Sequence, residues 1–525
     1  CFRAKPHNTT VHINNIDKWM ATFQIERQLH WSYTRAMSTP TFPSKCFVDG
    51  KWVSASSGKT FPVHNPANGQ VLTNVPSMVN SDVEKAISAA SSAFKTWKTT
   101  PAKDRSILLR KWYDLINKKV DLFANIIHLE AGKSIAEAKT EVVYGNSFLE
   151  WFSEEARRAY GDVLCSPTNT KRLMHIRQPA GVAAVITPWN FPLAMITRKA
   201  GAALAAGCTC VVKPAEDTPI TALALAECAA EAGIPRGVIN VVTAERSNAG
   251  PVGQLLCQSP LVSVVTFTGS TNVGKILYRH CAEGIKKISL ELGGNAPFIV
   301  FNSADIGAAT RGAIASKFRN CGQTCVSANR FLLQDSIHDE FVEKLNEAMD
   351  ACLHLGPQPK SSSTMMQELG PLINEAQLKK VDHMVQDAIE KGAKVVRGAK
   401  RATHLGDLYY EPTVLADVTP DMLCYNEEIF GPVVSCIRFK TEEEVLRIAN
   451  SSESGLAGYF FSQDLSQIFR VAEALEVGMV GINEGAISTP EAAFGGVKQS
   501  GLGREGSYHG LEEFMEWKYM CFGNL

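Results

Sequence analysis

Short runs of β-branched and other apolar residues recur about every 25–30 residues through the middle of the chain. Helix-like segments separate four of these runs, which are Val182–Ile186, Thr209–Val212, Val238–Val242 and Val262–Phe267. Parallel strands need a crossover of at least a dozen residues, so this spacing is typical of strand–helix–strand units. The pattern predicts an open, mostly parallel sheet whose ligands bind at the carboxyl ends of the strands.

A second series of strands and helices follows the first. Its strand-like runs are Pro297–Val300, Val433–Ile437, Tyr459–Ser462 and Val480–Asn483. Helical periodicity marks Val83–Trp97, Ser106–Ile126 and Ser134–Ala159 ahead of the first series, and a polar hairpin is predicted at Val163–Arg177. The fold class is therefore α/β, with two successive strand–helix layers.

The composition excludes several classes of protein. The 525 residues carry 53 basic and 53 acidic side chains, and this zero formal charge argues against partners such as nucleic acid or an anionic membrane. The longest apolar run, Ala200–Val212, is too short to span a bilayer, which needs about 20 residues. The 14 cysteines include no C-x-x-C pair and no zinc-type spacing, so we expect reduced thiols and no metal site.

The segment from Met20 to Lys45 is rich in hydroxyl and basic residues and contains one acid, Glu26. This composition is typical of a transit peptide, so residues 1–45 are interpreted as a targeting segment for the mitochondrial matrix. A disordered tail on a cytoplasmic protein is the alternative interpretation, and a translation start at Met37 would remove most of the basic signal.

Two segments at strand ends are candidates for binding a dinucleotide. Thr266–Gly274 joins a strand to a helix, where backbone N–H groups and the Ser270 hydroxyl can meet a phosphate. Lys213 and Glu216 follow the second strand, where an open α/β sheet holds an adenosine ribose. The alternative for Thr266–Gly274 is a plain turn between a strand and a helix. The alternative for Lys213 and Glu216 is a charged strand end that faces solvent. The G-x-G-x-x-G match at 501–506 does not follow a strand, so we interpret it as a loop.

The candidate nucleophile is a cysteine in the segment Phe318–Val326. A reactive thiol needs a polar, partly exposed setting, and both Cys321 and Cys325 lie in this glycine-containing turn, so context alone does not choose between them. Glu291 closes a strand ahead of two glycines, which would let a cofactor approach closely. A solvated residue at the strand end is the alternative to a role for Glu291 as a base.

Together these segments resemble the aldehyde dehydrogenase superfamily. Six motifs follow the order and spacing of that family, namely Thr187–Pro192, Lys213–Glu216, Phe267–Ser270, Glu291–Gly294, Gly322–Cys325 and Glu428–Pro432. The resemblance extends from about Cys46 to the C-terminus. Within the family, the succinate-semialdehyde dehydrogenases are similar in Leu149–Arg157, Ile196–Lys199, Ser316–Asn320 and Phe494–Arg504.

The resemblance implies two open doubly wound α/β domains and a small β element. An NAD-binding domain would comprise residues 46–162 and 178–291, and a catalytic domain residues 292–490. Residues 163–177 and 491–525 would form a bridging element that builds a homodimer or a homotetramer.

The resemblance also implies the catalytic residues. Cys325 would attack the aldehyde carbon, and the Asn190 amide and the Cys325 backbone N–H would stabilise the oxyanion, each by about 3 kcal/mol. Hydride transfer would leave a thioester, and Glu291 would deprotonate the water that hydrolyses it. Related enzymes often carry a second cysteine two residues after the nucleophile. This chain has Ser327 there, so a disulfide switch at that position is excluded.

NAD is the implied cofactor. Glu428 and Phe430 would hold the nicotinamide ribose and ring, and the Glu216 carboxylate would disfavour the 2′-phosphate of NADP. The implied cofactor contacts are Ile186, Thr187, Pro188, Trp189, Lys213, Glu216, Gly269, Ser270, Gly274, Glu428 and Phe430.

The implied substrate is a small aldehyde with a distal carboxylate. The reaction would be oxidation of succinic semialdehyde to succinate, the last step of 4-aminobutyrate degradation. Arg198, Arg319 and Ser488 match the carboxylate ligands of the subfamily, and a guanidinium is well suited to clamp a carboxylate.

Four alternatives accompany this interpretation. Each arginine could pair with a nearby acid on the surface. The enzyme could be a broader aldehyde dehydrogenase that accepts glutarate semialdehyde, 4-aminobutanal or aliphatic aldehydes. A CoA-acylating enzyme is disfavoured, because such enzymes need no water-activating glutamate and this chain retains Glu291. A non-catalytic protein is disfavoured, because Cys325, Glu291 and Asn190 are all present.

Overall fold

The computed structural model describes residues 42–358 and 366–524. The predicted targeting segment therefore lies almost entirely outside the described residues. Within those residues, every helix falls short of the length or the apolarity that crossing a membrane requires. The described chain forms two large, mostly parallel sheets covered by helices, together with a small three-stranded sheet, so the predicted fold class is confirmed.

The first sheet has eight strands in the order β2-β1-β9-β8-β7-β10-β11-β23. They are β1 (Cys46–Val48), β2 (Lys51–Val53), β7 (Val182–Ile186), β8 (Thr209–Lys213), β9 (Ile239–Val241), β10 (Val262–Thr268), β11 (Lys287–Glu291) and β23 (Gly501–Leu502). The central strands run parallel, while β1, β2 and β23 pair antiparallel at the edges. All residues of β7 and β8 are buried, which accounts for their continuous apolar sequences.

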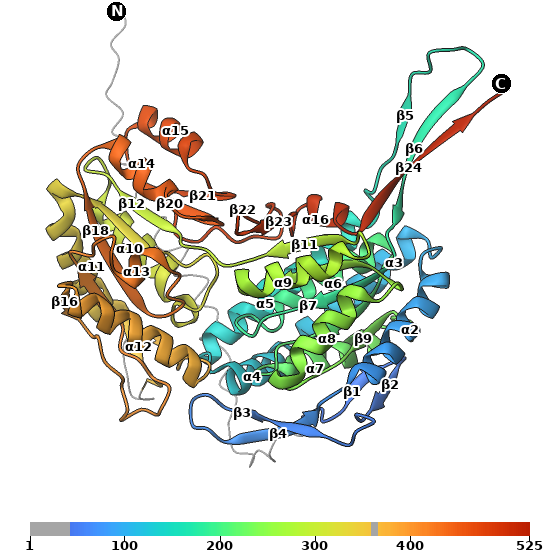
Figure 1. The fold of residues 1–525 in the computed structure, drawn as a ribbon, viewed down its shortest axis with the longest axis horizontal. Helices are drawn as coiled ribbons and strands as arrows, with labels where there is room; N and C mark the ends of the chain where they lie inside the picture. The colour runs from blue at the N-terminus through green and yellow to red at the C-terminus, as the bar shows by residue number, and fades with distance from the viewer. Residues whose placement is uncertain (1–41, 359–365, 525) are drawn as a thin grey trace, which may run out of the picture. The chain divides into compact units, whose positions relative to one another are not determined.

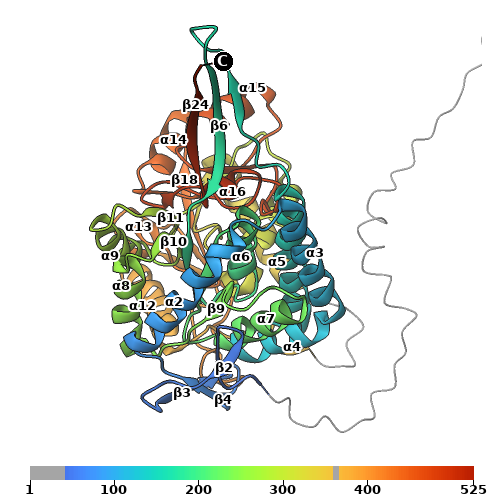
Figure 2. The ribbon, with the colours of Figure 1, turned by 90° about the vertical axis from the view of Figure 1, so that its right-hand side faces the viewer.

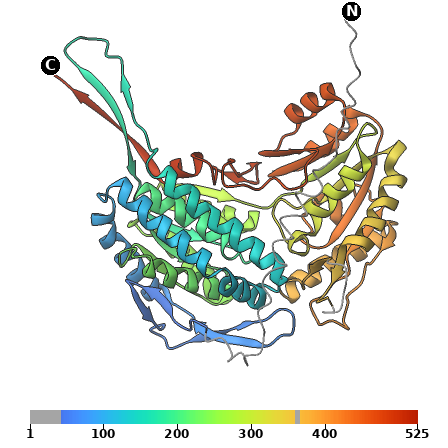
Figure 3. The ribbon, with the colours of Figure 1, turned by 180° about the vertical axis from the view of Figure 1, so that it is seen from behind.

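Helices cover both faces of the first sheet. They are α2 (Asn80–Trp97), α3 (Ala102–Lys118), α4 (Val120–Ala131), α5 (Ile135–Glu155), α6 (Ala194–Ala206), α7 (Pro219–Glu231), α8 (Arg246–Gln258) and α9 (Thr271–Ala282). Val182, Ala184 and Ile186 of β7 pack in one core with side chains of α2, α8 and α9, because alternate residues of a strand share a face. Figure 2 shows α8 and α9 on one side of the strands and α3, α5 and α6 on the other. From behind, the long helices α3 and α5 lie over the sheet (Figure 3).

The second sheet has seven strands in the order β16-β17-β18-β13-β12-β20-β21. They are β12 (Pro297–Val300), β13 (Arg330–Gln334), β16 (Lys394–Arg397), β17 (Thr413–Ala416), β18 (Val433–Phe439), β20 (Ala457–Phe461) and β21 (Met479–Ile482). Their helices are α10 (Ile306–Phe318), α11 (His338–Cys352), α12 (Glu375–Glu390), α13 (Leu423–Asn426), α14 (Glu442–Asn450) and α15 (Leu465–Ala474).

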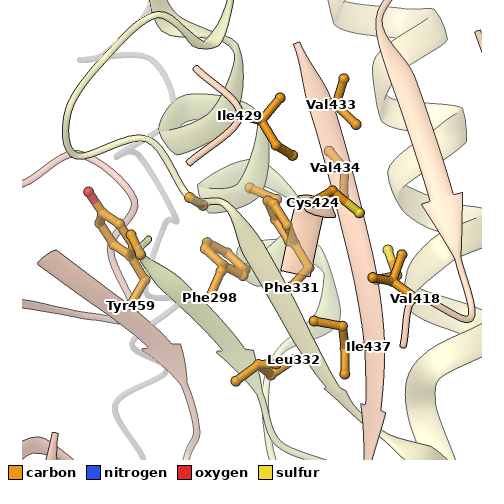
Figure 4. Packing of buried hydrophobic residues seen from close by; sticks show 14 of the residues in the cluster. Phe298, Phe331, Leu332, Val418, Cys424, Ile429, Val433, Val434, Ile437 and Tyr459 are labelled. Atoms are coloured by element: carbon orange, nitrogen blue, oxygen red, sulfur yellow. The ribbon is translucent and has the colours of Figure 1, made fainter. Parts of the chain in front are cut away.

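Phe298 lies at the centre of the core of this second sheet. Its ring centroid is 4.9 Å from that of Phe331 and 5.0 Å from that of Phe461, and its side chain is fully buried. Figure 4 shows Phe298 and Phe331 side by side on neighbouring strands, with Val418, Val434 and Ile437 completing the core farther along the sheet.

A small sheet contains three strands in the order β24-β6-β5. These strands are β5 (Asp162–Leu164), β6 (Arg172–Pro179) and β24 (Met515–Phe522), and they extend away from the helices in Figure 1. β6 and β24 pair antiparallel over their full lengths, and both faces expose large apolar or aromatic side chains, among them Val163, Trp517, Tyr519 and Phe522. The shorter elements are β3 (Thr60–His64), β4 (Val71–Pro76), β14 (Leu353–Leu355), β15 (Gln367–Leu369), β19 (Ser454–Gly455), β22 (Val497–Lys498) and α16 (His509–Glu512).

Two local predictions differ from the structure. The helix predicted over Ser106–Ile126 is interrupted at Lys119, whose φ and ψ of −114° and 21° are not helical, so α3 and α4 are separate helices. The pair Thr218–Pro219 predicts a helix start with Thr218 as the N-cap, because proline favours the first helical position. The helix α7 does begin there, but the Thr218 hydroxyl has no hydrogen-bond partner among the described residues. The buried Glu130 carboxylate caps α7 instead, accepting hydrogen bonds from the backbone N–H groups of Ile220 and Thr221 at 2.8 and 2.9 Å.

The fold predicts that replacing Phe298 by alanine destabilises the protein far more than replacing Phe469. We expect Phe298→Ala to lower the free energy of unfolding by about 3–5 kcal/mol, because a cavity would replace a fully packed ring. Phe469→Ala in α15 is the matched control, since that ring is 61% exposed and its loss should cost little. Urea denaturation followed by tryptophan fluorescence measures both values, and similar losses would contradict the assigned core.

Candidate active site

A sharp turn after α10 carries the candidate nucleophile. Asn320, Cys321 and Gly322 have positive φ angles of 52°, 55° and 75°. A side chain at Gly322 would place its Cβ 2.1 Å from the carbonyl oxygen of Gly431, so the turn requires glycine there. The turn ends at Cys325, which lines a cavity of about 200 Å³.

The geometry favours Cys325 over Cys321 as the nucleophile. The side chain of Cys321 is 1% exposed and its charged neighbours are Glu137 and Lys317, whereas Cys325 is 8% exposed and borders the cavity. The Cys325 thiol is hydrogen-bonded to the Glu291 carboxylate. Burial, followed by the nearby negative charge of Glu291, raises the pKa of this thiol well above its usual range. The resting thiol is therefore protonated, and it needs a base to become a nucleophile.

Asn190 connects the first sheet to the nucleophile turn. Its side-chain Nδ2 donates a hydrogen bond to the Gln323 carbonyl at 3.1 Å, and its own carbonyl accepts one from Asn320 Nδ2 at 3.0 Å. Asn190 also lines the cavity that Cys325 borders. The amide expected to stabilise an oxyanion is thus held in place within two residues of the nucleophile.

A larger cavity of about 640 Å³ runs along the carboxyl ends of β7, β8 and β10. Most of the residues predicted to bind a dinucleotide line it, namely Ile186, Thr187, Pro188, Trp189, Lys213, Glu216, Gly269 and Ser270. Pro188, Trp189 and Ser270 also line the smaller cavity at Cys325, so the two cavities are contiguous. Ser270 is the N-cap of α9 and accepts a hydrogen bond from the backbone N–H of Val273 at 3.4 Å.

The chemistry of this cavity wall fits a dinucleotide. Thr187 contributes a buried hydroxyl with no partner among the described residues. The Lys213 ammonium donates to the adjacent Pro214 carbonyl at 3.1 Å and keeps two further N–H donors. Gly274 does not face the cavity, since a Cβ there would lie 2.5 Å from a methyl of Leu292, and it serves close packing of α9.

Glu428 and Phe430 lie at the end of the small cavity next to Cys325. A Glu428 oxygen accepts a hydrogen bond from the backbone N–H of Gly294 at 3.2 Å. Burial raises the pKa of Glu428 to about 7. The rings of Phe430 and Trp189 meet edge to face with centroids 5.5 Å apart, and both rings line the smaller cavity.

Four charged side chains form a buried cluster behind Cys325, which we call the charge cluster: Arg198, Lys199, Glu291 and Glu505. Arg198 Nη2 lies 3.1 Å from Glu291 Oε2, and Arg198 also forms an ion pair with Glu505. Lys199 forms an ion pair with Glu505 and donates to the Thr268 hydroxyl at 2.6 Å. The cluster has no net charge, which is the condition under which buried charges are tolerated.

The environment of the charge cluster shifts the pKa values of Glu291 and Glu505 in opposite directions. Burial raises the pKa of Glu291 above its ordinary value, and the charge of Glu505 adds to this effect although Arg198 opposes it. Burial also disfavours ionised Glu505, but Arg198 and Lys199 together outweigh burial and lower its pKa. Glu291 is therefore the more basic of the two carboxylates, and Glu505 the more acidic.

The three residues predicted to bind a substrate carboxylate have different environments. Arg198 is 1% exposed and already paired with two acids, as the alternative interpretation held, although in the interior and not on the surface. Arg319 is half-buried and forms no ion pair with any residue of the described ranges; its guanidinium lies over the rings of Phe191 and Tyr144, at 4.7 and 5.3 Å. Ser488 is half-buried in the segment after β21.

Sequence reasoning missed Tyr144, Lys199 and Glu505. The Tyr144 hydroxyl is hydrogen-bonded to Arg198, while its ring supports Arg319, so it lies between the two arginines. The adjacent cations Arg198 and Lys199 in an otherwise apolar helix were a usable signal. Glu505 carried none, because it pairs with residues about 300 positions earlier in the chain.

The described residues contain no group of three or more histidine, cysteine or acidic side chains able to hold a metal ion. The site therefore offers a thiol, a buried carboxylate, an oriented amide and a dinucleotide-sized cavity. These groups suit nucleophilic attack on a carbonyl carbon followed by hydride transfer and hydrolysis.

Residues 52–520 match the model of the aldehyde dehydrogenase family, and the chain belongs to this family. It is 56% identical to the mitochondrial succinate-semialdehyde dehydrogenase of Hylobates lar, over 93% of this chain and 90% of that protein. It is 52% identical to the glutarate-semialdehyde dehydrogenase of Pseudomonas aeruginosa, over 92% of this chain and 98% of the other. The crystal structure of an NADP-dependent enzyme from Escherichia coli superimposes with a TM-score of 0.89 at 51% identity, covering 92% of this chain and 98% of that one.

The nucleophile turn yields a prediction with an internal control. We expect Gly322→Ala to abolish most dehydrogenase activity, because the new methyl would displace the Gly431 backbone and move Cys325. Gly58 has a similar φ of 68° with no atom within 4 Å of its would-be Cβ, so Gly58→Ala bears only the backbone strain, about 1 kcal/mol. Steady-state rates and urea denaturation of both variants test this; equal activity in the two would contradict it.

Proposed function

We propose that this enzyme oxidises succinic semialdehyde to succinate with NAD, the last step of 4-aminobutyrate degradation. Arg319 carries the proposal, because it is a half-buried cation without an ion-pair partner in the described chain, six residues before Cys325. A carboxylate at the far end of a short aldehyde would form an ion pair with Arg319 and neutralise its charge. The name of the mitochondrial relative supports this substrate, and that of the Pseudomonas aeruginosa relative supports glutarate semialdehyde as a second candidate.

The chain's own residues would carry the reaction in two stages. The Cys325 thiol passes its proton to the hydrogen-bonded Glu291 carboxylate, and the thiolate attacks the aldehyde carbon. Asn190 Nδ2 and the Cys325 backbone N–H bind the oxyanion that results. Lys213 and Ser270 in the 640 Å³ cavity, with Glu428 and Phe430 in the 200 Å³ cavity, would hold NAD, which would supply the hydride acceptor. Before hydrolysis, Glu291 gives up the thiol's proton to solvent. It then takes a proton from the water that attacks the thioester, and the carbon–sulfur bond breaks with its electron pair on Cys325.

NAD is proposed over NADP because of the charge at the adenosine end of the cavity. Glu216 lines this cavity, and Asp217 lies beside it with its pKa raised to about 6 by burial and by the charge of Glu216. Two adjacent carboxylates would repel a 2′-phosphate. The related Escherichia coli structure is that of an NADP-dependent enzyme, so the preference requires a direct measurement.

The remaining proposals concern organisation and location. We propose that residues 46–162 with 178–291 form the NAD-binding domain, 292–490 the catalytic domain, and 163–177 with 491–525 the bridging element. The exposed aromatic side chains of β24 suit contact with another copy in a homodimer or homotetramer. Part of the last segment has a second role, because β23 extends the first sheet. The mitochondrial relative and the basic N-terminal composition support the mitochondrial matrix.

The substrate proposal predicts a clear order of rates. Purified protein should form NADH fastest with succinic semialdehyde, and slower with glutarate semialdehyde, propanal and 4-aminobutanal. Arg319→Gln should lower kcat/KM for succinic semialdehyde by about tenfold to a hundredfold and leave propanal nearly unchanged, as expected for loss of a charge-assisted contact. Arg110→Gln, on the exposed face of α3, is the control. Equal rates with propanal and succinic semialdehyde would refute the carboxylate preference.

The cofactor proposal is tested at Glu216. We expect Glu216→Ser to raise kcat/KM for NADP by about tenfold and to lower it for NAD, because one of two repelling charges is removed and a ribose contact is lost. Glu245→Ser is the matched control, since Glu245 lies outside the 640 Å³ cavity. A wild-type enzyme that uses NADP as well as NAD would refute the preference directly.

A further inference from the structure

Arg198 stands between the base of the proposed reaction and the place where a substrate carboxylate would bind. Its guanidinium already serves two carboxylates, with Glu291 Oε2 at 3.1 Å from Nη2 and Glu505 at Nε. The Tyr144 hydroxyl is hydrogen-bonded to the same guanidinium, and the Phe494 ring lies 4.4 Å from its central carbon. In the free enzyme, this cation therefore holds Glu291.

We propose that the distal carboxylate of the substrate displaces Glu291 from Arg198, and that this exchange releases the base for hydrolysis of the thioester. The inference rests on the proposed function, because it requires an aldehyde that carries a carboxylate. It assigns Arg198 a positioning role toward Glu291 in addition to contact with the substrate. An aldehyde without a carboxylate would form the thioester, but hydrolysis of that thioester would be slow because Glu291 would stay paired with Arg198.

Glu291 and Glu505 both form ion pairs with Arg198, but Glu505 has more stabilising contacts. This difference determines which carboxylate the substrate displaces. Glu505 has a second cation, Lys199, which is itself fixed by the Thr268 hydroxyl at 2.6 Å. Within the described chain, Glu291 forms an ion pair with one cation, Arg198, and its buried Oε1 has no hydrogen-bond partner. A third carboxylate at Arg198 would therefore displace Glu291, whose remaining contact is the Cys325 thiol.

In this proposal, the carboxylate enters past Arg319 and Tyr144. Both side chains are half-buried, and they lie together with the Arg319 guanidinium 5.3 Å from the Tyr144 ring. Tyr144 reaches from this pair to Arg198 through its hydroxyl. An entering carboxylate would meet Arg319 first and then find the Tyr144 hydroxyl and Arg198 in sequence, as the aldehyde end reaches Cys325.

The chemical step that the exchange permits is balanced within the site. A water oxygen attacks the thioester carbon, its proton moves to the freed Glu291 carboxylate, and the carbon–sulfur bond breaks with its electron pair on Cys325. The products are the acid, a Cys325 thiolate and protonated Glu291. No oxidant is consumed, because the hydride has already left.

The test separates the carboxylate from the aldehyde. Propanal and formate together contain the parts of succinic semialdehyde, so formate can occupy the carboxylate position while propanal reacts at Cys325. In rapid mixing of wild-type enzyme with NAD and propanal, we expect a burst of NADH followed by a slow steady state. Added formate should raise the steady-state rate saturably, by about threefold or more, without changing the burst amplitude. Chloride at equal ionic strength is the control and should have no effect.

The variants test whether Arg198 is the site of the exchange. Arg198→Gln should remove the formate effect and raise the propanal steady state toward the burst rate, because nothing then holds Glu291. If that variant does not fold, Arg198→Lys keeps the charge, and we expect it to need several-fold more formate. Arg110→Gln should behave as wild type. Absence of a burst, absence of a formate effect in wild type, or an unchanged formate effect in either Arg198 variant would overturn the inference. A preference for succinic semialdehyde would still stand in each case, so the proposed function fails only on its own test.

Discussion

The charge cluster of Arg198, Lys199, Glu291 and Glu505 is the interaction on which the candidate site depends. It joins α6, the end of β11 and the C-terminal loop, so three segments far apart in the sequence meet at one buried point. Removing one member of such a cluster leaves a buried charge unpaired, at a cost of about 3–5 kcal/mol. The cluster therefore fixes the C-terminal segment against the first sheet and, by the same contacts, holds Glu291 beside Cys325.

The nucleophile depends on a second set of contacts between the two sheets. Its turn needs positive φ angles at three consecutive residues, a conformation that persists only where surrounding contacts impose it. Asn190 supplies one contact through Gln323, and the Glu137 carboxylate supplies another by accepting a hydrogen bond from the Asn320 backbone N–H at 2.9 Å. A residue of the segment after β7 and a residue of α5 thus position Cys325, which lies between α10 and β13.

Much of this arrangement was predictable from local patterns. The buried strands β7, β8, β10 and β12 were recognisable as apolar runs, because strands covered on both faces carry no polar alternation. The residues lining the dinucleotide cavity were recognisable from motifs at strand ends. Other features were beyond local reasoning: the interruption at Lys119, the capping of α7 by Glu130 in place of Thr218, and the pairing of Arg198 with two acids in the interior.

Local patterning was enough to define the fold class, the family and the candidate residues, since periodicity and short motifs depend on neighbours within a few turns of chain. Tertiary contacts alone decided which cysteine borders the cavity, which arginine has no ion-pair partner in the described chain, and which glutamate lies beside that cysteine. Ion pairing explains the difference: Lys199 and Glu505 are 306 residues apart, and no local pattern records a partner at that separation. The sequence determines which residues carry a charge, but only the folded chain determines which residue of opposite charge lies beside each of them.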